Sequence, residues 1–312
     1  MWQLVSSIYL GWALGANDAS NVFGTAVASR MLRFWTAAVL AAVFILLGAV
    51  LGGAAGMETY RDLSKTTLNT AFIVGLMSAF TVTVMTWKQL PVSTSQAVVG
   101  ALIAVGVWHG DVQLGILGKV VICWVGTPIG AMILALVLYM LVGWGLNALH
   151  LNMFRYDQVV RWGLVVAGCY GAYALGANNV ANVTGAFVGE GMLGVQGACL
   201  IGGLSIALGV LTYSRGVMLT VGKGLVKLDA FSALVVILSE GLTVHIYAMV
   251  GVPVSTSQAV VGGVLGIGIV KGVRTVNKKV LVNILLAWLS TPVIAFGITY
   301  VGCLVADRFG WL

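Results

Sequence analysis

Two polar strings each occur twice in the amino-acid sequence, and their residue types are suited to binding small ions. The string Pro-Val-Ser-Thr-Ser-Gln-Ala-Val-Val-Gly occupies residues 91–100 and is repeated at 253–262. Gly-Ala-Asn-Asp-Ala-Ser-Asn, at 15–21, is echoed by Gly-Ala-Asn-Asn-Val-Ala-Asn at 176–182. Both strings interrupt apolar sequence. A duplicated helix interruption in a membrane predicts a substrate site shared between two halves.

The proline string predicts a helix that starts inside the bilayer, because proline has no amide hydrogen and the residue before it avoids helical geometry. The first turn of such a helix leaves backbone N–H groups unpaired at the positive end of the dipole. Hydroxyl donors accompany them: Ser93, Thr94 and Ser95 in one copy, and Ser255, Thr256 and Ser257 in the other. Two converging helix starts predict a cradle for a small oxyanion. The alternative is that these hydroxyls only cap helices or bond to carbonyls, but the repeat favours binding.

The Gly-Ala-Asn string predicts a cation site. Asp18 ends an apolar segment, where a carboxylate costs about 2.5–3.5 kcal/mol on insertion scales, and no lysine or arginine lies near it in the sequence. Oxygen ligands without histidine or cysteine suit a hard ion such as Na⁺. The expected ligands are Asn17, Asp18, Asn21, Asn178, Asn179 and Asn182, with unwound carbonyls at Gly15 and Gly176. The alternative is that Asp18 caps the next helix at a water interface.

Other polar residues carry weaker signals. Glu240, inside an apolar run, is either a proton or cation site or a partner in an interhelical hydrogen bond. The sequence has no Ser-His-Asp set, His-Glu-x-x-His string, Walker sequence or paired cysteine ligands. It therefore offers no machinery for hydrolysis or ATP-driven pumping, and we expect no enzyme activity.

The elements that position these residues are apolar. Of 312 residues, 60% are hydrophobic and 8% are charged, whereas soluble domains carry about 25% charge. Runs long enough to cross a bilayer are Phe34–Met57, Leu68–Trp87, Val120–Leu141, Leu193–Tyr213 and Val280–Val305. We predict an all-α polytopic membrane protein.

The duplication divides the chain into an N-terminal membrane repeat at 1–150, a short cytoplasmic linker at 151–158 and a C-terminal repeat at 159–312. Each half reads as about five membrane segments, including a first helix broken at Gly-Ala-Asn and a fourth broken at proline. Because five is odd, the second half must enter from the opposite side, giving inverted-topology repeats. The interrupted segments also allow re-entrant helices in place of some of the roughly ten crossings.

The net charge is +7, and the basic residues are distributed unevenly between the loops. With the N-terminus outside, the inner loops hold Arg30, Arg33, Lys88, Arg155, Arg161, Arg215, Lys223, Lys227, Lys271, Arg274, Lys278 and Lys279. The outer loops hold only Arg61, Lys65, Lys119 and Arg308. This positive-inside pattern predicts a multi-pass protein of the cell (inner) membrane with both ends outside, and lipid rather than nucleic acid as its surroundings.

The two duplicated strings, in this order, resemble those of the inorganic phosphate transporter family, the sodium- or proton-coupled phosphate permeases. The resemblance covers nearly the whole chain. It implies symport of inorganic phosphate with a coupling cation, Na⁺ more than H⁺, by inverted repeats in a homodimer. Carried over, phosphate would contact Ser93, Thr94, Ser95, Gln96, Ser255, Thr256, Ser257 and Gln258. The cation ligands would be those named above, with Thr81 and Thr243 added.

Two departures from the family pattern keep alternatives open. The family usually has Asp at the position of Asn179, and many relatives have Thr-His where this chain has Ser-Gln in both proline strings. Sulfate permeases of the same fold keep a similar Ser-Thr-Ser string, so sulfate or another tetrahedral oxyanion is the nearest alternative. A passive anion channel is the next, and an intramembrane enzyme lacks a nucleophile–base pair.

Overall fold

The computed structural model describes residues 2–28, 30–87, 92–188, 192–221, 228–272 and 278–312. Within these ranges the regular structure is helical, apart from an isolated bridge between Val188 and Leu193. The helices of the first half are α1 (Leu4–Ala28), α2 (Phe34–Gly52), α3 (Ala54–Leu63), α4 (Leu68–Trp87), α5 (Thr94–His109) and α6 (Leu114–Ala148). Those of the second are α7 (Met153–Thr184), η1 (Gly185–Phe187), α8 (Val195–Val221), α9 (Ala230–Val250), α10 (Thr256–Lys271) and α11 (Lys278–Arg308).

Seven of the described helices are long and apolar enough to cross a bilayer: α2, α4, α6, α7, α8, α9 and α11. Their outward faces are apolar as well; on α6, Ile122 is 73% exposed and Val125 is 61% exposed. In water such faces would be costly, whereas hydrocarbon accommodates them. The chain is a multi-pass membrane protein, as the composition predicts.

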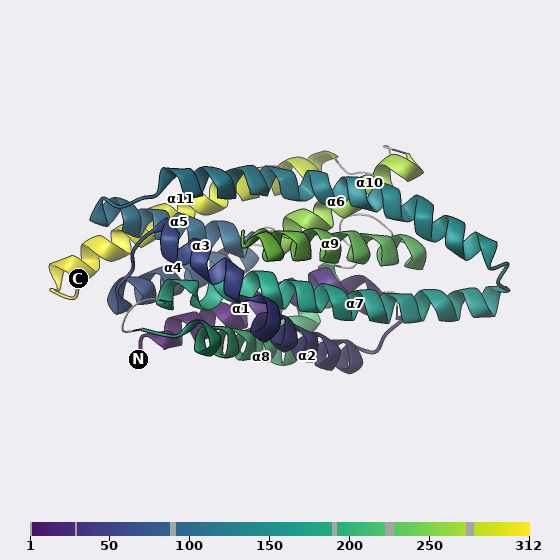
Figure 1. The fold of residues 1–312 in the computed structure, drawn as a ribbon, viewed down its shortest axis with the longest axis horizontal. Coiled ribbons are helices and arrows are strands. Elements are labelled where there is room, and N and C mark those ends of the chain that lie inside the picture. Colours follow the sequence, from purple (N-terminus) through teal and green to yellow (C-terminus); the bar gives the residue numbers. More distant parts are fainter. Residues whose placement is uncertain (1, 29, 88–91, 189–191, 222–227, 273–277) are drawn as a thin grey trace.

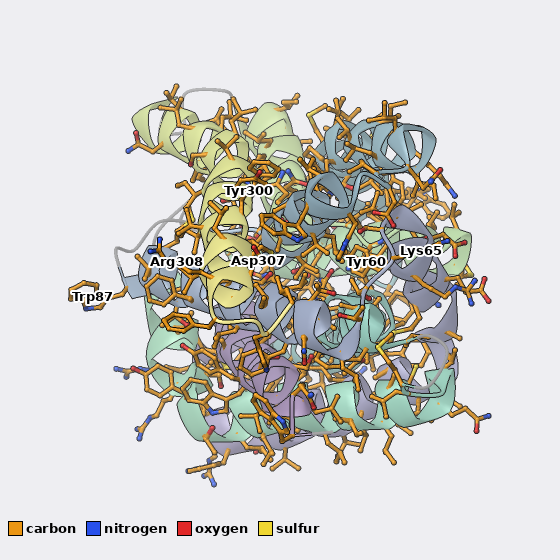
Figure 2. The ribbon with its side chains drawn as sticks, turned by 90° about the vertical axis from the view of Figure 1, so that its left-hand side faces the viewer. Tyr60, Lys65, Trp87, Tyr300, Asp307 and Arg308 are labelled. Carbon is orange, nitrogen blue, oxygen red and sulfur yellow. The ribbon has the colours of Figure 1, made fainter. Side chains whose placement is uncertain are left out.

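The two halves run in opposite directions along the molecule. In Figure 1, α1 begins at the end that carries both termini, whereas α7 begins at the other end, after the turn that follows α6. Figure 2 looks onto the terminal end and shows the helices side by side in one bundle, with Trp87 projecting from its flank. This arrangement confirms the predicted all-α fold of two inverted repeats.

The halves are also interleaved by close helix crossings. The first helix of each half packs against the second helix of the other, α1 against α8 and α7 against α2. Glycines allow the approach: a Cβ on Gly15 would lie 2.0 Å from the carbonyl oxygen of Ile206, and one on Gly176 would lie 2.0 Å from that of Ile45. Small residues at such crossings are typical of membrane helix packing.

These glycines correct one expectation. The Gly-Ala-Asn strings do not break their helices, because α1 and α7 continue through residues 15–21 and 176–182 without interruption. The carbonyls of Gly15 and Gly176 are therefore not unwound and are not presented as cation ligands. Glycine serves here to bring two helices together.

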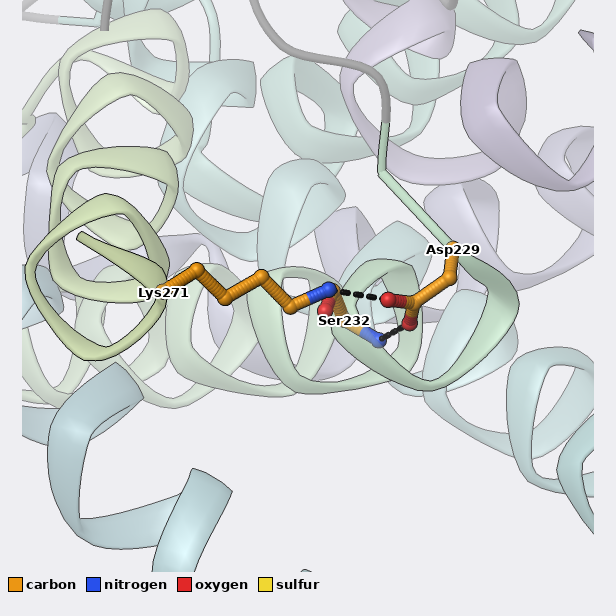
Figure 3. A network of polar contacts seen from close by, with 3 residues as sticks. All are labelled: Asp229, Ser232 and Lys271. Carbon is orange, nitrogen blue, oxygen red and sulfur yellow. Dashed lines mark hydrogen bonds and ion pairs between the residues drawn. The ribbon is translucent and has the colours of Figure 1, made fainter. Parts of the chain in front are cut away.

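Two pairs of helices, the α4–α5 and α9–α10 hairpins, enter from opposite ends of the molecule, and α5 and α10 begin inside it (Figure 1). At the open end of the second hairpin, Asp229 caps α9 by accepting a hydrogen bond from the Ser232 amide (2.8 Å). Asp229 also forms an ion pair with Lys271 at the end of α10, so that one carboxylate ties the two helices together (Figure 3). Several residues used in the sequence analysis lie outside the described ranges: Lys88, Pro91, Lys223, Lys227 and Arg274.

Candidate oxyanion and cation site

Both proline strings place a helix start in the interior of the protein. α5 begins at Thr94 and α10 begins at Thr256, each after a serine in an extended conformation. The Ser93 hydroxyl accepts a hydrogen bond from the Gln96 amide (3.4 Å), and Ser255 accepts the equivalent bond from Gln258 (3.3 Å). These are N-cap bonds, and they confirm the predicted helix starts.

The two helix starts contact each other through reciprocal hydrogen bonds. Ser95 Oγ donates to the carbonyl oxygen of Val254 (2.9 Å), and Ser257 Oγ donates to that of Val92 (3.1 Å). Each bond runs from the first turn of the helix of one half to the valine two residues before the helix of the other half. The starts of α5 and α10 therefore meet, as a shared site requires.

Behind the helix starts, each hairpin packs on the other half through the glycine that ends its ten-residue string. A Cβ on Gly100 would lie 2.3 Å from the carbonyl oxygen of Pro292 in α11. A Cβ on Gly262 would lie 2.2 Å from that of Pro128 in α6. The helix starts are thus held by backbone contacts from both halves.

Some polar atoms at the helix starts remain without a protein partner. Thr94 Oγ1, Gln96 Oε1 and Gln258 Oε1 are buried and accept or donate no hydrogen bond within the described residues. Apart from the Gln96 and Gln258 amides, which bond to the N-cap serines, the first-turn amides have no partner within their own helices. Because buried polar groups are normally paired, these atoms are available to a polar ligand. Hydroxyl and amide donors suit an oxyanion, and the two Oε1 acceptors suit an oxyanion that carries a proton.

Asp18 contacts the first turn of α10. Its Oδ2 accepts hydrogen bonds from the Thr256 hydroxyl (3.1 Å) and from Asn179 Nδ2 (3.4 Å), and the side chain is 5% exposed. Asn21 Nδ2 lies 3.3 Å from the same Thr256 hydroxyl. The first Gly-Ala-Asn string and the second proline string therefore share one polar cluster, although they come from different halves.

The second Gly-Ala-Asn string makes a different set of contacts. Asn178 forms two hydrogen bonds to the backbone of Val254: its Nδ2 donates to the carbonyl (2.7 Å), and its Oδ1 accepts from the amide (3.0 Å). Asn179 Oδ1 accepts from the amide groups of Asn178 (3.0 Å) and Asn182 (2.8 Å). Tyr60 on α3 donates in turn to Asn182 Oδ1. Protein donors thus occupy the amide oxygens of this copy, and its asparagines brace the helix start.

The remaining predicted ligands make local hydrogen bonds. Asn17 Nδ2 donates to Thr86 Oγ1 (3.0 Å). The hydroxyls of Thr81 (2.8 Å) and Thr243 (2.7 Å) each donate to the carbonyl four residues earlier in the same helix. Their oxygens keep lone pairs, but no hydrogen bond among those described links them to Asp18. Sequence patterns did not single out Tyr60, because it lies on a short helix without a duplicated motif.

The chemistry of the first-half donor set fits a hard cation. Asp18 supplies a carboxylate. Asn17 and Asn21 bond to threonine hydroxyls through their Nδ2 atoms, so these hydrogen bonds do not use their side-chain oxygens. Among the described residues, no group of three or more His, Cys, Asp or Glu side chains could hold a metal ion. Neutral oxygens with a carboxylate suit Na⁺ better than a transition metal.

The fold and the site together define a class. Inverted repeats that bring two half-helix starts and a buried carboxylate into one polar cluster form the architecture of a membrane transporter.

Comparison with known proteins gives the family. A sequence model of the phosphate transporter family matches residues 14–155 and again 150–299, so the chain belongs to this family of transporters, which are not enzymes. It is 32% identical over 299 residues to a protein of Methanocaldococcus jannaschii provisionally named a phosphate permease, covering 96% of this chain and 95% of that one. It is 28% identical to a sulfate permease of Bacillus subtilis, over 95% of this chain and 85% of that one.

The fold also matches a solved structure, that of a protein described as the sodium-dependent phosphate transporter. The TM-score is 0.85, and the match covers 99% of this chain and 100% of the other, with 22% sequence identity. At this identity the likeness shows a common fold.

Proposed function

We propose that this protein is a secondary active symporter that takes up inorganic phosphate together with a cation, with Na⁺ favoured over H⁺. The observation that carries the proposal is the meeting of two helix starts, joined by the Ser95–Val254 and Ser257–Val92 hydrogen bonds, beside Asp18. The family and the sodium-dependent fold relative support it.

In this proposal phosphate binds at the helix starts and the cation binds beside it. The phosphate-binding residues are Ser93, Thr94, Ser95, Gln96, Ser255, Thr256, Ser257 and Gln258. The cation-binding region is made by Asn17, Asp18, Asn21, Thr81, Asn178, Asn179, Asn182 and Thr243. Within these sets two kinds of residue differ in their contacts. Thr94, Gln96 and Gln258 each have a polar atom without a hydrogen-bond partner in the described part of the chain, whereas Asn178 and Asn182 bond to protein groups.

Charge explains why a cation must accompany the anion. Moving a divalent anion into a cell against about 100 mV costs roughly 4.6 kcal/mol, at about 2.3 kcal/mol per charge. Among the described residues, no buried side chain is a lysine or arginine. Positive potential at the site then comes from helix N-termini and from cations, and a co-transported cation removes the penalty of the membrane potential.

Phosphate is favoured over sulfate by the acceptors at the site. At neutral pH phosphate carries at least one proton, which can be donated to Gln96 Oε1 or Gln258 Oε1, whereas sulfate has no proton to donate. A site that leaves buried acceptors unpaired discriminates against the ligand that cannot pair them. The second candidate is sulfate uptake, which the likeness to a sulfate permease supports.

The topology follows from the basic residues. We place the end that carries both termini outside the cell (inner) membrane and the turn between α6 and α7 in the cytoplasm, because arginine and lysine concentrate at that second end. The functional units are then an N-terminal repeat at 1–150, a cytoplasmic linker at 151–158 and a C-terminal repeat at 159–312. We propose that the protein works as a homodimer in lipid.

Uptake into proteoliposomes tests this function. With an inward sodium gradient, radiolabelled phosphate should accumulate, and excess sulfate should compete only weakly. With an inward proton gradient in potassium buffer, accumulation should be much smaller. Equal uptake with and without a cation gradient would indicate a channel, and strong competition by sulfate would favour the second candidate.

The carboxylate of Asp18 provides a sharper form of the same test. Asp18→Asn keeps the size of the side chain and a hydrogen-bond acceptor for Thr256, but removes the charge. We expect this variant to lose cation-dependent uptake while it elutes and melts like the wild type. Full sodium-dependent uptake by Asp18→Asn would contradict the role assigned to Asp18.

A further inference from the structure

The two halves differ at a pair of symmetry-related positions on the hairpin helices α4 and α9. The spacing from Thr81 to Thr243 is that of the duplicated proline strings, and the same spacing relates Ser78 to Glu240. The halves differ in the opposite sense at the Gly-Ala-Asn strings, where Asp18 corresponds to Asn179. Each half therefore has one carboxyl group at these positions, but in a different place.

Glu240 is buried, and no basic side chain among the described residues forms an ion pair with it. The side chain is 1% exposed, and its Oε2 has no hydrogen-bond partner within the described residues. The ion pairs among those residues, Arg61–Asp62 and Lys271–Asp229, both involve solvent-exposed side chains. An interhelical hydrogen bond to Oε2, the alternative meaning of a glutamate here, is not present in this part of the chain.

The surroundings of Glu240 point towards the site. α9 packs against both α1 and α10, which carry Asp18 and Thr256. The carboxyl of Glu240 lies within electrostatic reach of Asp18. The hydroxyl of Ser78, at the related position of the first half, is likewise fully buried without a partner among the described residues. The position thus holds an unpaired polar group in both halves, and in the second half that group is a carboxyl.

Two ionised carboxylates that share a buried region without a basic residue need compensating positive charge. Removing one partner of a buried ion pair costs about 3–5 kcal/mol, because it leaves a charge uncompensated. A carboxylate with a free oxygen is a good ligand for a hard cation. No arginine or lysine among the described residues is buried, so in the ionised state the compensating charge would come from a bound cation.

We propose that Glu240 is a ligand of a second coupling cation, in place of the carboxylate that symmetry would put at Asn179. This inference rests on the proposed symport. It predicts that the second Gly-Ala-Asn string has become a brace for Val254, while cation binding in the second half has moved to α9.

Equilibrium binding of ²²Na⁺ to the purified protein without phosphate tests the inference independently of transport. Glu240→Gln should lose one of the sodium ions that the wild type binds, and Glu240→Asp should keep the same number with weaker affinity. Glu240→Ser, which copies Ser78, should behave like Glu240→Gln. Adding Asn179→Asp to Glu240→Ser returns the carboxylate to the symmetric position and should restore the lost ion.

In proteoliposomes, Glu240→Gln should raise the sodium concentration for half-maximal uptake about tenfold, which corresponds to about 1.4 kcal/mol. Elution volume and thermal stability check that each variant is folded, and Glu240→Asp retains the charge if the neutral variants are unstable. If the wild type binds sodium and Glu240→Gln or Glu240→Ser binds as much with the same affinity, the inference is wrong and the symport stands. If wild-type uptake does not depend on sodium, the proposed symport itself is contradicted.

Discussion

Adjacent hydroxyls in the proline string have different partners, and this separates binding from structure. Thr94 Oγ1 has no partner among the described residues, whereas Ser95 Oγ donates to Val254 across the two halves. A hydroxyl that already donates to a carbonyl has no second proton for an anion. Thr94 is therefore the better candidate donor to phosphate, and Ser95 the better candidate for holding the hairpins together.

Thr94→Val should weaken phosphate binding without destabilising the protein. Valine has nearly the same shape as threonine and removes a buried hydroxyl that has no partner among the described residues. The free energy of unfolding should therefore be unchanged or slightly higher. Loss of one hydrogen bond to a charged ligand should lower phosphate affinity about tenfold. Binding of radiolabelled phosphate and a thermal melt of the same preparation measure the two effects, and unchanged affinity would remove Thr94 from the site.

Ser95→Ala combined with Ser257→Ala should have the complementary effect on stability. Each change removes one hydrogen bond between the halves, to the carbonyl of Val254 or of Val92, although the Val254 carbonyl keeps its bond from Asn178. Side-chain hydrogen bonds between membrane helices contribute about 0.6 kcal/mol each on average, so the double variant should be about 1 kcal/mol less stable. Denaturation in mixed micelles measures this loss, with Thr94→Val as the matched control. A double variant as stable as the wild type would show that these bonds do not hold the hairpins.

At the scale of elements, glycines determine how closely the helices of different halves approach. The crossing of α1 with α8 places Gly15 against the backbone of Ile206. Backbone cannot rotate away from an added methyl group as a side chain can. The helices must then separate, together with the residues that α1 presents to the site.

Gly15→Ala should therefore destabilise the fold by about 1–3 kcal/mol, the usual cost of overpacking. Gly297→Ala on α11 is the matched control, because a Cβ there meets nothing within 4 Å. Alanine favours helix over glycine by up to about 1 kcal/mol, so the control should be neutral or more stable. The thermal midpoint of each purified variant gives the comparison. Equal midpoints for the two alanine variants would refute the close crossing.

The Asp229–Lys271 ion pair at the open end of the α9–α10 hairpin gives a pH prediction. Burial raises the pKa of Asp229, but hydrogen bonds from Lys271 and Ser232 outweigh it, and the pKa lies below its usual value. Since the folded-state pKa is lowered, the stabilisation is fully present above the unfolded value, about 3.9, and is lost as the pH falls through the lower folded value. Because the pair is partly exposed, the contribution should be no more than about 1 kcal/mol and should shrink in high salt.

Two substitutions separate the stabilisation by the ion pair from that by the N-cap hydrogen bond. Asp229→Asn keeps a good N-cap for Ser232 but removes the ion pair, whereas Asp229→Ala removes both and should cost about 1 kcal/mol more. At neutral pH and low salt the melting order should be wild type, then Asn, then Ala. At acid pH the difference between wild type and Asn should disappear. An Asn variant as stable as the wild type in low salt would mean that the ion pair contributes nothing.

At the scale of the whole molecule, the duplicated strings made the fold predictable. Two proline strings predict two helix starts, and the odd number of segments in each half predicts opposite entry, so the meeting of α5 and α10 follows from the sequence. The error at Gly-Ala-Asn has a physical reason. Glycine permits both a helix break and a close helix crossing, and only the position of Ile206 in three dimensions decides between them.

Other parts of the site could not be read from the sequence. The bond from Tyr60 to Asn182 joins residues that are distant in the chain and belong to no common pattern. The two Gly-Ala-Asn copies look alike, yet Asn178 braces Val254 while Asp18 contacts Thr256. Which ions bind at these residues remains a prediction for experiment.

One measurement tests the shared site most directly: the stoichiometry of phosphate binding to the purified protein in sodium buffer. The account predicts one phosphate per chain, with affinity lowered both by Gln96→Leu and by Gln258→Leu, because it assigns the unpaired Oε1 atoms of these two glutamines, one from each half, to a single site. Substitution of sodium by choline should weaken the same binding. Two phosphates per chain, or a glutamine variant with unchanged affinity, would contradict a single site built between the halves.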